Sequence, residues 1–213
     1  MSKPAEHSIL MNGEMVRAIR EGRKTQTRRV VKLNHAGRVK AVGSPKNWHL
    51  DDPDAVLACP YGVPGDRLWA RETFFYDWEH ARVFYRADAD EDGSVPYMVD
   101  GAGGFGGGVG NANIDKWKPS IHMPRRLCRI LLEVVSVRVE RVQEISEDDA
   151  MAEGVLEYGW EDGIPGGPVC TSHVARLGFE SMWQDIYYNR GYGWDVNPHV
   201  WVVEFKVIEG SAA

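Results

Sequence analysis

The chain has 213 residues, a formal net charge of −6 at pH 7 and 43% hydrophobic residues. A chain of this length buries about 70% of the surface of its unfolded form, so it fits one domain without disulfide cross-links. The acidic charge argues against non-specific coating of nucleic acid, and three cysteines without CxxC spacing indicate neither a disulfide framework nor a cysteine-rich zinc site. No apolar run approaches the roughly 20 residues that cross a bilayer, and the N-terminus lacks a signal-peptide pattern. We therefore expect a cytoplasmic protein with no membrane partner.

The N-terminal part of the chain predicts a helix, a strand and an insertion. Residues 11–22 have an apolar stripe at helical spacing and end in a glycine, as an amphipathic helix does. A basic run over residues 23–29 leads to Val30 and Val31, where we expect the first strand. Residues 33–60 are polar and weakly periodic, which indicates an insertion.

The middle of the chain predicts short strands around a glycine-rich loop. A turn at residues 64–66 precedes an apolar strand, and residues 83–87 form a second short strand. The run GAGGFGGGVG at residues 101–110 lacks the Lys-Ser/Thr ending of a P-loop and the spacing of a dinucleotide-binding motif. It therefore predicts a surface loop or flap within a second insertion, at about residues 88–116.

The C-terminal part has the clearest periodicity. Residues 129–142 predict a long strand, and alternation over residues 135–140 predicts that one of its faces is solvated. Helices are expected at residues 146–154, which begin with an N-capping serine, and at residues 173–188. Residues 200–207 predict a closing strand. Because strands and helices do not alternate strictly, the pattern indicates an α+β domain with a largely antiparallel barrel or sheet.

Four motifs in this order resemble a known family. Residues 22–29, GRKTQTRR, resemble the Gly-x-Lys-Thr-x-Thr-x-Arg signature of the ASCH superfamily, which follows a short helix. The family's order continues with the Gly-Asp turn and strand at residues 65–69, the helix motif at 149–154 and the final strand at 203–206. Tryptophan-rich phrases at residues 117–125 and 197–206 are similar to an uncharacterised branch that is common in bacteriophage and prophage genomes. For a phage-encoded protein, the expected location is the cytoplasm of the bacterial host.

The resemblance implies one PUA-like domain over residues 1–213, built as a β-barrel of mostly antiparallel strands with flanking helices. It also implies a cleft beside the first helix that binds RNA or a modified nucleoside. Compact bacterial members of the superfamily are amidohydrolases that remove the acetyl group of N4-acetylcytidine with a threonine, a lysine and a glutamate. Carried over to this chain, these catalytic roles fall on Thr27, Lys24 and Glu153, and Arg29 matches the arginine of the signature.

The implied chemistry sets requirements on these residues. A hydroxyl nucleophile such as Thr27 needs a base that removes its proton. Lys24 can be that base only if it is neutral, which requires its pKa to fall by about three units from about 10.4. Glu153 suits the role of a proton shuttle or a water-orienting group. On a straight strand Lys24 and Thr27 point to opposite faces, so they converge only if the chain bends after Gly22 or the lysine side chain curls back.

Further residues are candidates for substrate binding. They are basic or aromatic side chains near the family motifs: Arg28, Arg29, Trp69, His122 and Arg125. The arginines and the histidine suit a phosphate or another ligand oxygen, and a tryptophan can stack on a base. The seven histidines form no HxH or HExxH pair, so neither a metal nor another cofactor is expected.

Two other functions fit the same cleft, namely a non-catalytic RNA-binding module and a ribonuclease that needs no metal. The residues alone also fit a structural role, in which Lys24, Arg28 and Arg29 form a solvated helix exit and Thr27 is a packed strand residue. The resemblance favours the hydrolase, with a modified nucleoside or RNA as its partner.

Overall fold

The computed structural model describes residues 3–40, 47–90, 94–99, 108–114, 116–155 and 174–208. The α-helices in these ranges are α1 (Gly13–Arg20), α2 (Glu147–Ala152) and α3 (Val174–Tyr187). The strands are β1 (Glu6–Leu10), β2 (Gln26–Val30), β3 (Val39–Lys40), β4 (Asn47–Trp48), β5 (Arg67–Arg71), β6 (Phe74–Asp77), β7 (Arg82–Tyr85), β8 (Ser94–Val99), β9 (Gly108–Asn113), β10 (Leu131–Arg141) and β11 (His199–Val207). Short 3-10 helices are η1 (Pro53–Ala58), η2 (Arg86–Asp88), η3 (Ser120–His122), η4 (Arg125–Leu127), η5 (Val142–Glu144), η6 (Tyr188–Arg190) and η7 (Trp194–Val196).

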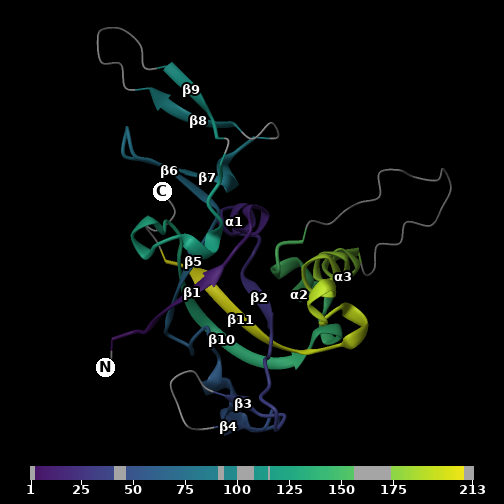
Figure 1. Ribbon diagram of the computed structural model, residues 1–213. Helices are drawn as coiled ribbons and strands as arrows, with labels where there is room; N and C mark the ends of the chain where they lie inside the picture. Colours follow the sequence, from purple (N-terminus) through teal and green to yellow (C-terminus); the bar gives the residue numbers. More distant parts are fainter. Residues whose placement is uncertain are drawn as a thin grey trace, which may run out of the picture.

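A five-stranded mixed sheet of order β1-β5-β10-β11-β2 forms the centre of the fold (Figure 1). The first pair, β1 and β5, is parallel, and the other three pairs are antiparallel. Hairpins β3–β4, β6–β7 and β8–β9 form separate two-stranded sheets. The chain is thus a mixed α and β structure with mainly antiparallel strands. Among the described strands β1 and β2 are the sheet edges, and no backbone pairing closes the sheet into a barrel.

The two faces of the sheet pack against different helices. On β11, Trp201, Val203 and Phe205 belong to the core cluster that contains the apolar residues of α1. Val200 and Val202 alternate with them and belong to the cluster that contains the buried residues of α2 and α3. We call these the α1 face and the α3 face of the sheet. Figure 1 shows α1 above the curved strands β10 and β11, and α2 and α3 beside their far end.

Local signals explain both helices that flank the candidate site. Asn12 caps α1 by accepting a hydrogen bond from Met15 N at 2.8 Å, and Ser146 caps α2 in the same way from Asp149 N at 3.1 Å. Gly22 follows α1 in the chain and has φ +75°, a left-handed conformation that suits glycine after a helix. The expected helices at residues 11–22 and 146–154 are therefore confirmed, as are the strands β5, β10 and β11.

Three expectations differ from the structure. No pattern in the sequence predicts a strand at residues 6–10, where β1 pairs with β5. The basic run was expected before the first strand, but β2 begins at Gln26 and contains Arg28 and Arg29. The polar face of β10 was expected to be solvated, but its Arg138 takes part in an ionic network with other elements. In the last two cases, carboxylates neutralise Arg28 and Arg138, a compensation that a hydropathy pattern does not reveal.

The expected insertions contain regular structure where they are described. Residues 33–60 contain β3, β4 and η1, and Ala58 and Cys59 at the end of η1 belong to the core cluster of the α1 face. Within residues 88–116, β8 and β9 form a hairpin that extends away from the sheet in Figure 1. Of the expected glycine-rich loop, residues 101–107 lie outside the described ranges and residues 108–110 begin β9. No helix in the described ranges is long and apolar enough to span a membrane.

Candidate active site

Lys24 and Glu153 meet where the ends of α1 and α2 come together. The backbone N–H of Lys24 donates to Ala18 O of α1 at 3.0 Å, and the N–H of Thr25 donates to Ala152 O of α2 at 2.8 Å. Lys24 and Glu153 themselves form an isolated antiparallel bridge. The bend at Gly22 therefore brings Lys24 beside α2 before β2 begins.

Glycine at position 154 permits this close approach. Gly154 has φ +86°, and a Cβ atom there would lie 2.9 Å from the Cβ of Ala18 and 3.0 Å from the Cβ of Lys24. Both distances are shorter than ordinary carbon contacts, and the backbone conformation disfavours any other residue. At the end of α2, Glu153 thus places its carboxylate beside Lys24, and Gly154 leaves room for α1.

The side chains of Lys24 and Glu153 form a buried ion pair. Lys24 Nζ lies 2.7 Å from Glu153 Oε2 and 2.8 Å from Glu153 O, and the two side chains are 0% and 2% exposed. The other carboxylate oxygen, Oε1, lies 3.3 Å from Arg28 Nη1. Glu153 is thus held between two cations from the segment that carries the family-like signature.

Burial changes the acid–base character of Lys24. Loss of hydration lowers the pKa of Lys24, the charge of Glu153 raises it, and the charges of Arg29 and Arg28 lower it again, so that the pKa lies below its usual value. A lysine base in catalysis needs a shift in this direction, because only the neutral amine accepts a proton.

Arg28 is the centre of a wider ionic network on the α3 face. Its Nη2 lies 2.5 Å from Glu140 Oε1 of β10 and 2.9 Å from Asp149 Oδ2 of α2. Arg138 of β10 also reaches Asp149 at 3.0 Å, and Gln26 Nε2 donates to Asp149 Oδ1 at 3.0 Å. The side chain of Arg28 is 0% exposed, so this predicted substrate-binding residue is enclosed by three carboxylates.

Thr27 lies on the other side of β2. In the pairing of β2 with β11, Thr27 is opposite Val203 of the α1 face, whereas Arg28 is opposite Val202 of the α3 face. Thr27 Oγ1 accepts a hydrogen bond from Arg29 Nη1 at 2.8 Å. Of the contacts that the structure describes, none joins Thr27 to the Lys24–Glu153 pair. The opposite-face geometry expected for a straight strand is therefore present, even though the chain bends after Gly22.

The remaining predicted binding residues lie around β5 and η4. Arg125 stands over the Trp69 ring, 5.9 Å from its centroid, and also pairs with Glu6 at 2.9 Å. His122 is exposed at the end of η3. In the described part of the chain, none of Trp69, His122 and Arg125 contacts Lys24, Thr27 or Glu153. The sequence-predicted residues are thus not gathered in one site, because Lys24 and Arg28 lie with Glu153, Thr27 lies with Arg29, and Trp69 lies with Arg125. Their roles stay predictions.

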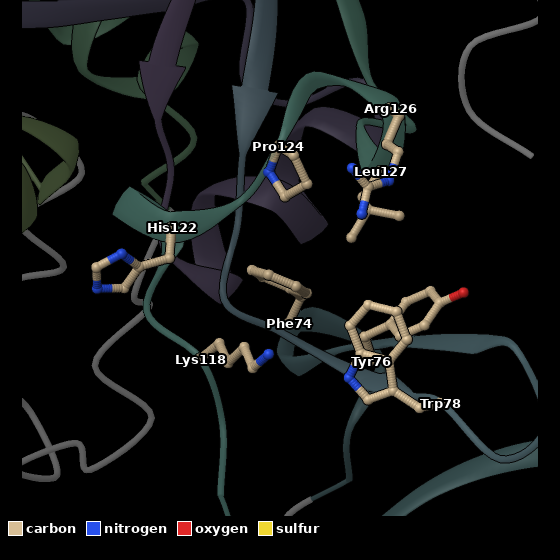
Figure 2. Close-up of a pocket in the computed structure, with 8 residues that line it drawn as sticks. All are labelled: Phe74, Tyr76, Trp78, Lys118, His122, Pro124, Arg126 and Leu127. Atoms are coloured by element: carbon tan, nitrogen blue, oxygen red, sulfur yellow. The ribbon is translucent and has the colours of Figure 1, made fainter.

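An open pocket of about 460 Å³ lies beside β6 (Figure 2). Its lining residues are mostly aromatic, apolar or basic: Phe74, Tyr76, Trp78, Lys118, His122, Pro124, Arg126 and Leu127. The sequence analysis identified only His122 among them, and Figure 2 shows its ring turned away from Phe74 at the pocket centre. Alternation of the aromatic residues in the sequence FFYDW was the signal that could have revealed this pocket.

Within the described ranges, no group of three or more histidine, cysteine, aspartate and glutamate side chains is placed to hold a metal ion. Comparison of the chain with models of protein families, with curated proteins and with solved structures found no match.

Proposed function

We propose that this chain is a hydrolase that removes an acyl group from a modified nucleoside or base, most simply the acetyl group of N4-acetylcytidine. The observation that carries the proposal is the buried pair of Lys24 and Glu153, whose atoms lie 2.7 Å apart within motifs that resemble the ASCH superfamily. Ionisable groups with altered pKa values concentrate at functional sites, and the pKa of Lys24 is lowered.

The proposal includes the PUA-like barrel of that superfamily. This part of the proposal is supported by the approach of β1 and β2, the two edge strands of the sheet. Arg29 of β2 donates from Nη2 to the backbone oxygen of Leu10 in β1 at 2.9 Å. A side chain therefore joins the strands at the two ends of the sheet order, as expected for a strongly curved, barrel-like sheet.

The reaction adds one water across the amide bond. The C–N bond breaks, the acyl carbon gains the water oxygen, and the leaving amine nitrogen gains a proton. The charge of Glu153 favours the charged form of Lys24, so Lys24 acts as a base once substrate binding has separated the pair. The neutral Lys24 then accepts the proton of the attacking water, and the same proton passes to the leaving nitrogen through Lys24 or Glu153. Arg28 holds the second oxygen of Glu153 and so acts as a positioning residue.

Thr27 has a different place in this scheme from the one that the resemblance implies. Because Thr27 lies on the α1 face with Arg29, the proposal uses water as the nucleophile and gives Thr27 a positioning role through Arg29. The side chains of Lys24 and Glu153 are 0% and 2% exposed, so substrate binding has to part α2 from α1.

Turnover of N4-acetylcytidine tests the proposal, with release of cytidine followed by chromatography. The wild type and Thr27→Ser are expected to release cytidine, and Thr27→Val is expected to retain part of the activity because no covalent bond to Thr27 forms. Complete loss in Thr27→Val with retention in Thr27→Ser would make Thr27 the nucleophile. Absence of turnover by the wild type would contradict the proposed function.

A further inference from the structure

Three aromatic residues at alternate positions lie in β6 and in the turn that follows it. Phe74, Tyr76 and Trp78 occupy alternate positions, and all three line the pocket beside this strand. Phe74 is 3% exposed and forms the floor, whereas Trp78 is 73% exposed. The rings of Tyr76 and Trp78 meet edge to face, with centroids 4.4 Å apart. The indole of Trp78 is thus exposed to solvent beside the rings of Phe74 and Tyr76. Such an exposed group of aromatic rings is typical of a surface that stacks on a planar ligand.

The opposite wall of the pocket is fixed to the same hairpin. The backbones of Phe74 and Lys118 exchange two hydrogen bonds, with N–O distances of 3.1 and 2.7 Å. The hydroxyl of Tyr85 in β7 donates to Leu127 O in η4 at 2.8 Å. These bonds hold the segment that carries Pro124 and Leu127 against β6. The pocket therefore exists before a ligand binds, which reduces the entropy lost on binding.

Two basic side chains in the pocket have no carboxylate partner among the described residues. Lys118 and Arg126 are exposed, and neither forms an ion pair in the part of the chain that the structure describes. The neighbouring arginines differ, because Arg125 pairs with Glu6, and Arg129 pairs with Glu72 and Asp88. In Figure 2 the side chains of Lys118 and Arg126 lie on opposite sides of the aromatic group.

The composition of the pocket restricts the ligand. None of the lining residues that the structure describes is acidic, which disfavours a cation, and the two exposed cationic groups favour a ligand with negative charge. The volume of about 460 Å³ suits a small organic molecule. Aromatic faces stack on nucleobases, and lysine and arginine bind phosphate oxygens.

We infer that this pocket binds a nucleotide, with its base against Tyr76 and Trp78 and its phosphate at Arg126. The ligand chemistry is a nucleobase joined to a phosphate, which is present both in a free nucleotide and in single-stranded nucleic acid. The inference goes beyond the proposed hydrolase, since no described contact links the pocket residues to Lys24 or Glu153. The two sites can therefore be tested separately.

Calorimetric titration with uridine and adenosine 5′-monophosphates tests the inference directly. Binding is expected, and Trp78→Ala and Arg126→Ala should each weaken it by about tenfold or more. Matched controls are Tyr188→Ala, which removes another exposed aromatic ring, and Lys32→Ala, which removes an exposed lysine elsewhere. Both controls should bind as the wild type does, and uridine without its phosphate should bind about tenfold more weakly.

A five-residue oligouridylate distinguishes the two sources of the ligand. Affinity about tenfold higher for the oligomer would identify single-stranded nucleic acid, and equal affinity would identify a free nucleotide. The Lys24→Met variant should bind as the wild type does, even where it is inactive on N4-acetylcytidine. Failure of all these ligands to bind, or unchanged binding by Trp78→Ala and Arg126→Ala, would overturn the inference. Dimerisation that sedimentation detects in the wild type but not in Trp78→Ala would also overturn it, because a second copy would then cover the pocket.

Discussion

Lys24 Nζ lies 2.7 Å from Glu153 Oε2, although the two residues are 129 positions apart in the chain. The contact joins the turn after α1 to the C-terminal end of α2, and both side chains are almost completely removed from solvent. Two buried charges of opposite sign stabilise each other only as a pair, because either one alone would keep its full desolvation cost.

Removal of the carboxylate should therefore destabilise the fold. In Glu153→Gln, Lys24 and Arg28 lose the charge between them, and the free energy of unfolding should fall by about 3–5 kcal/mol. Urea denaturation followed by circular dichroism measures this change. The control is Glu79→Gln, which removes an exposed glutamate and should change stability by less than about 0.5 kcal/mol. Equal midpoints for the two variants would show that the pair does not hold the ends of α1 and α2 together.

Gly154→Ala should destabilise the protein more than a glycine replacement at an open position. Gly37 also has a positive φ, +69°, but a Cβ atom there would meet nothing within 4 Å. Gly37→Ala therefore measures the backbone strain alone, which should lower the free energy of unfolding by about 1–2 kcal/mol. Gly154→Ala adds contacts with Ala18 and Lys24 at 2.9 and 3.0 Å, which should cost about 1–3 kcal/mol more. The difference in unfolding free energy between the variants isolates the close approach, and its absence would contradict the observed packing of α2 against α1.

Asp149 should contribute to stability at neutral pH and lose this contribution in acid. Burial raises the pKa of Asp149, but the hydrogen bond from Gln26 and the charges of Arg28 and Arg138 outweigh burial, so that its pKa lies below the usual 3.8. The folded state thus favours the ionised form, whose contribution is present above pH 3.8 and disappears as the pH falls through the folded-state pKa.

Urea titrations of the wild type and Asp149→Asn between pH 6 and pH 2 measure this contribution. The wild type should be the more stable at pH 6, and the difference should shrink toward acid pH. Asp195→Asn, at an exposed position, should follow the wild type throughout. A difference that stays constant over this range would show that ionisation of Asp149 does not stabilise the network.

Two cysteine thiols should resist alkylation in the native protein. Burial raises the pKa of Cys59 to about 12 and also raises the pKa of Cys128. Since the thiolate is the reactive form, iodoacetamide at pH 8 should leave both residues unmodified, as judged by peptide mass spectrometry. The same reagent in urea should modify both. Rapid labelling of native Cys59 would show that the segment after η1 opens readily.

Much of the secondary structure follows from local signals. The capping residues Asn12 and Ser146 and the glycines at positions 22 and 154 delimit α1 and α2, and a run of valine and aromatic residues indicates β11. The edge strand β1 could not be predicted in the same way, because its sequence EHSIL is short and mostly exposed. Its pairing with β5 depends on contacts between segments distant in sequence.

The candidate site was only partly predictable for the same reason. Spacing alone places Lys24 and Thr27 on opposite faces of a straight strand, and the structure has this arrangement. The position of Glu153 against Lys24 depends on how α2 packs, which the family-like motif implies but no local pattern shows. Burial of Arg28 likewise depends on three carboxylates from β10 and the end of α2. Because these carboxylates are distant in sequence, the basic segment alone predicts a solvated position for Arg28.

Release of cytidine from N4-acetylcytidine by the wild type and by Lys24→Met tests the central claim most directly. The account predicts one acetate per cytidine from the wild type and a rate lower by at least about 100-fold in Lys24→Met. Lys32→Met, which replaces an exposed lysine, should be as active as the wild type. Circular dichroism would verify that Lys24→Met is folded. Lys24→Arg keeps a positive charge but cannot act as a base near pH 7, so it should be inactive as well. Turnover by Lys24→Met or Lys24→Arg at the wild-type rate would contradict the account.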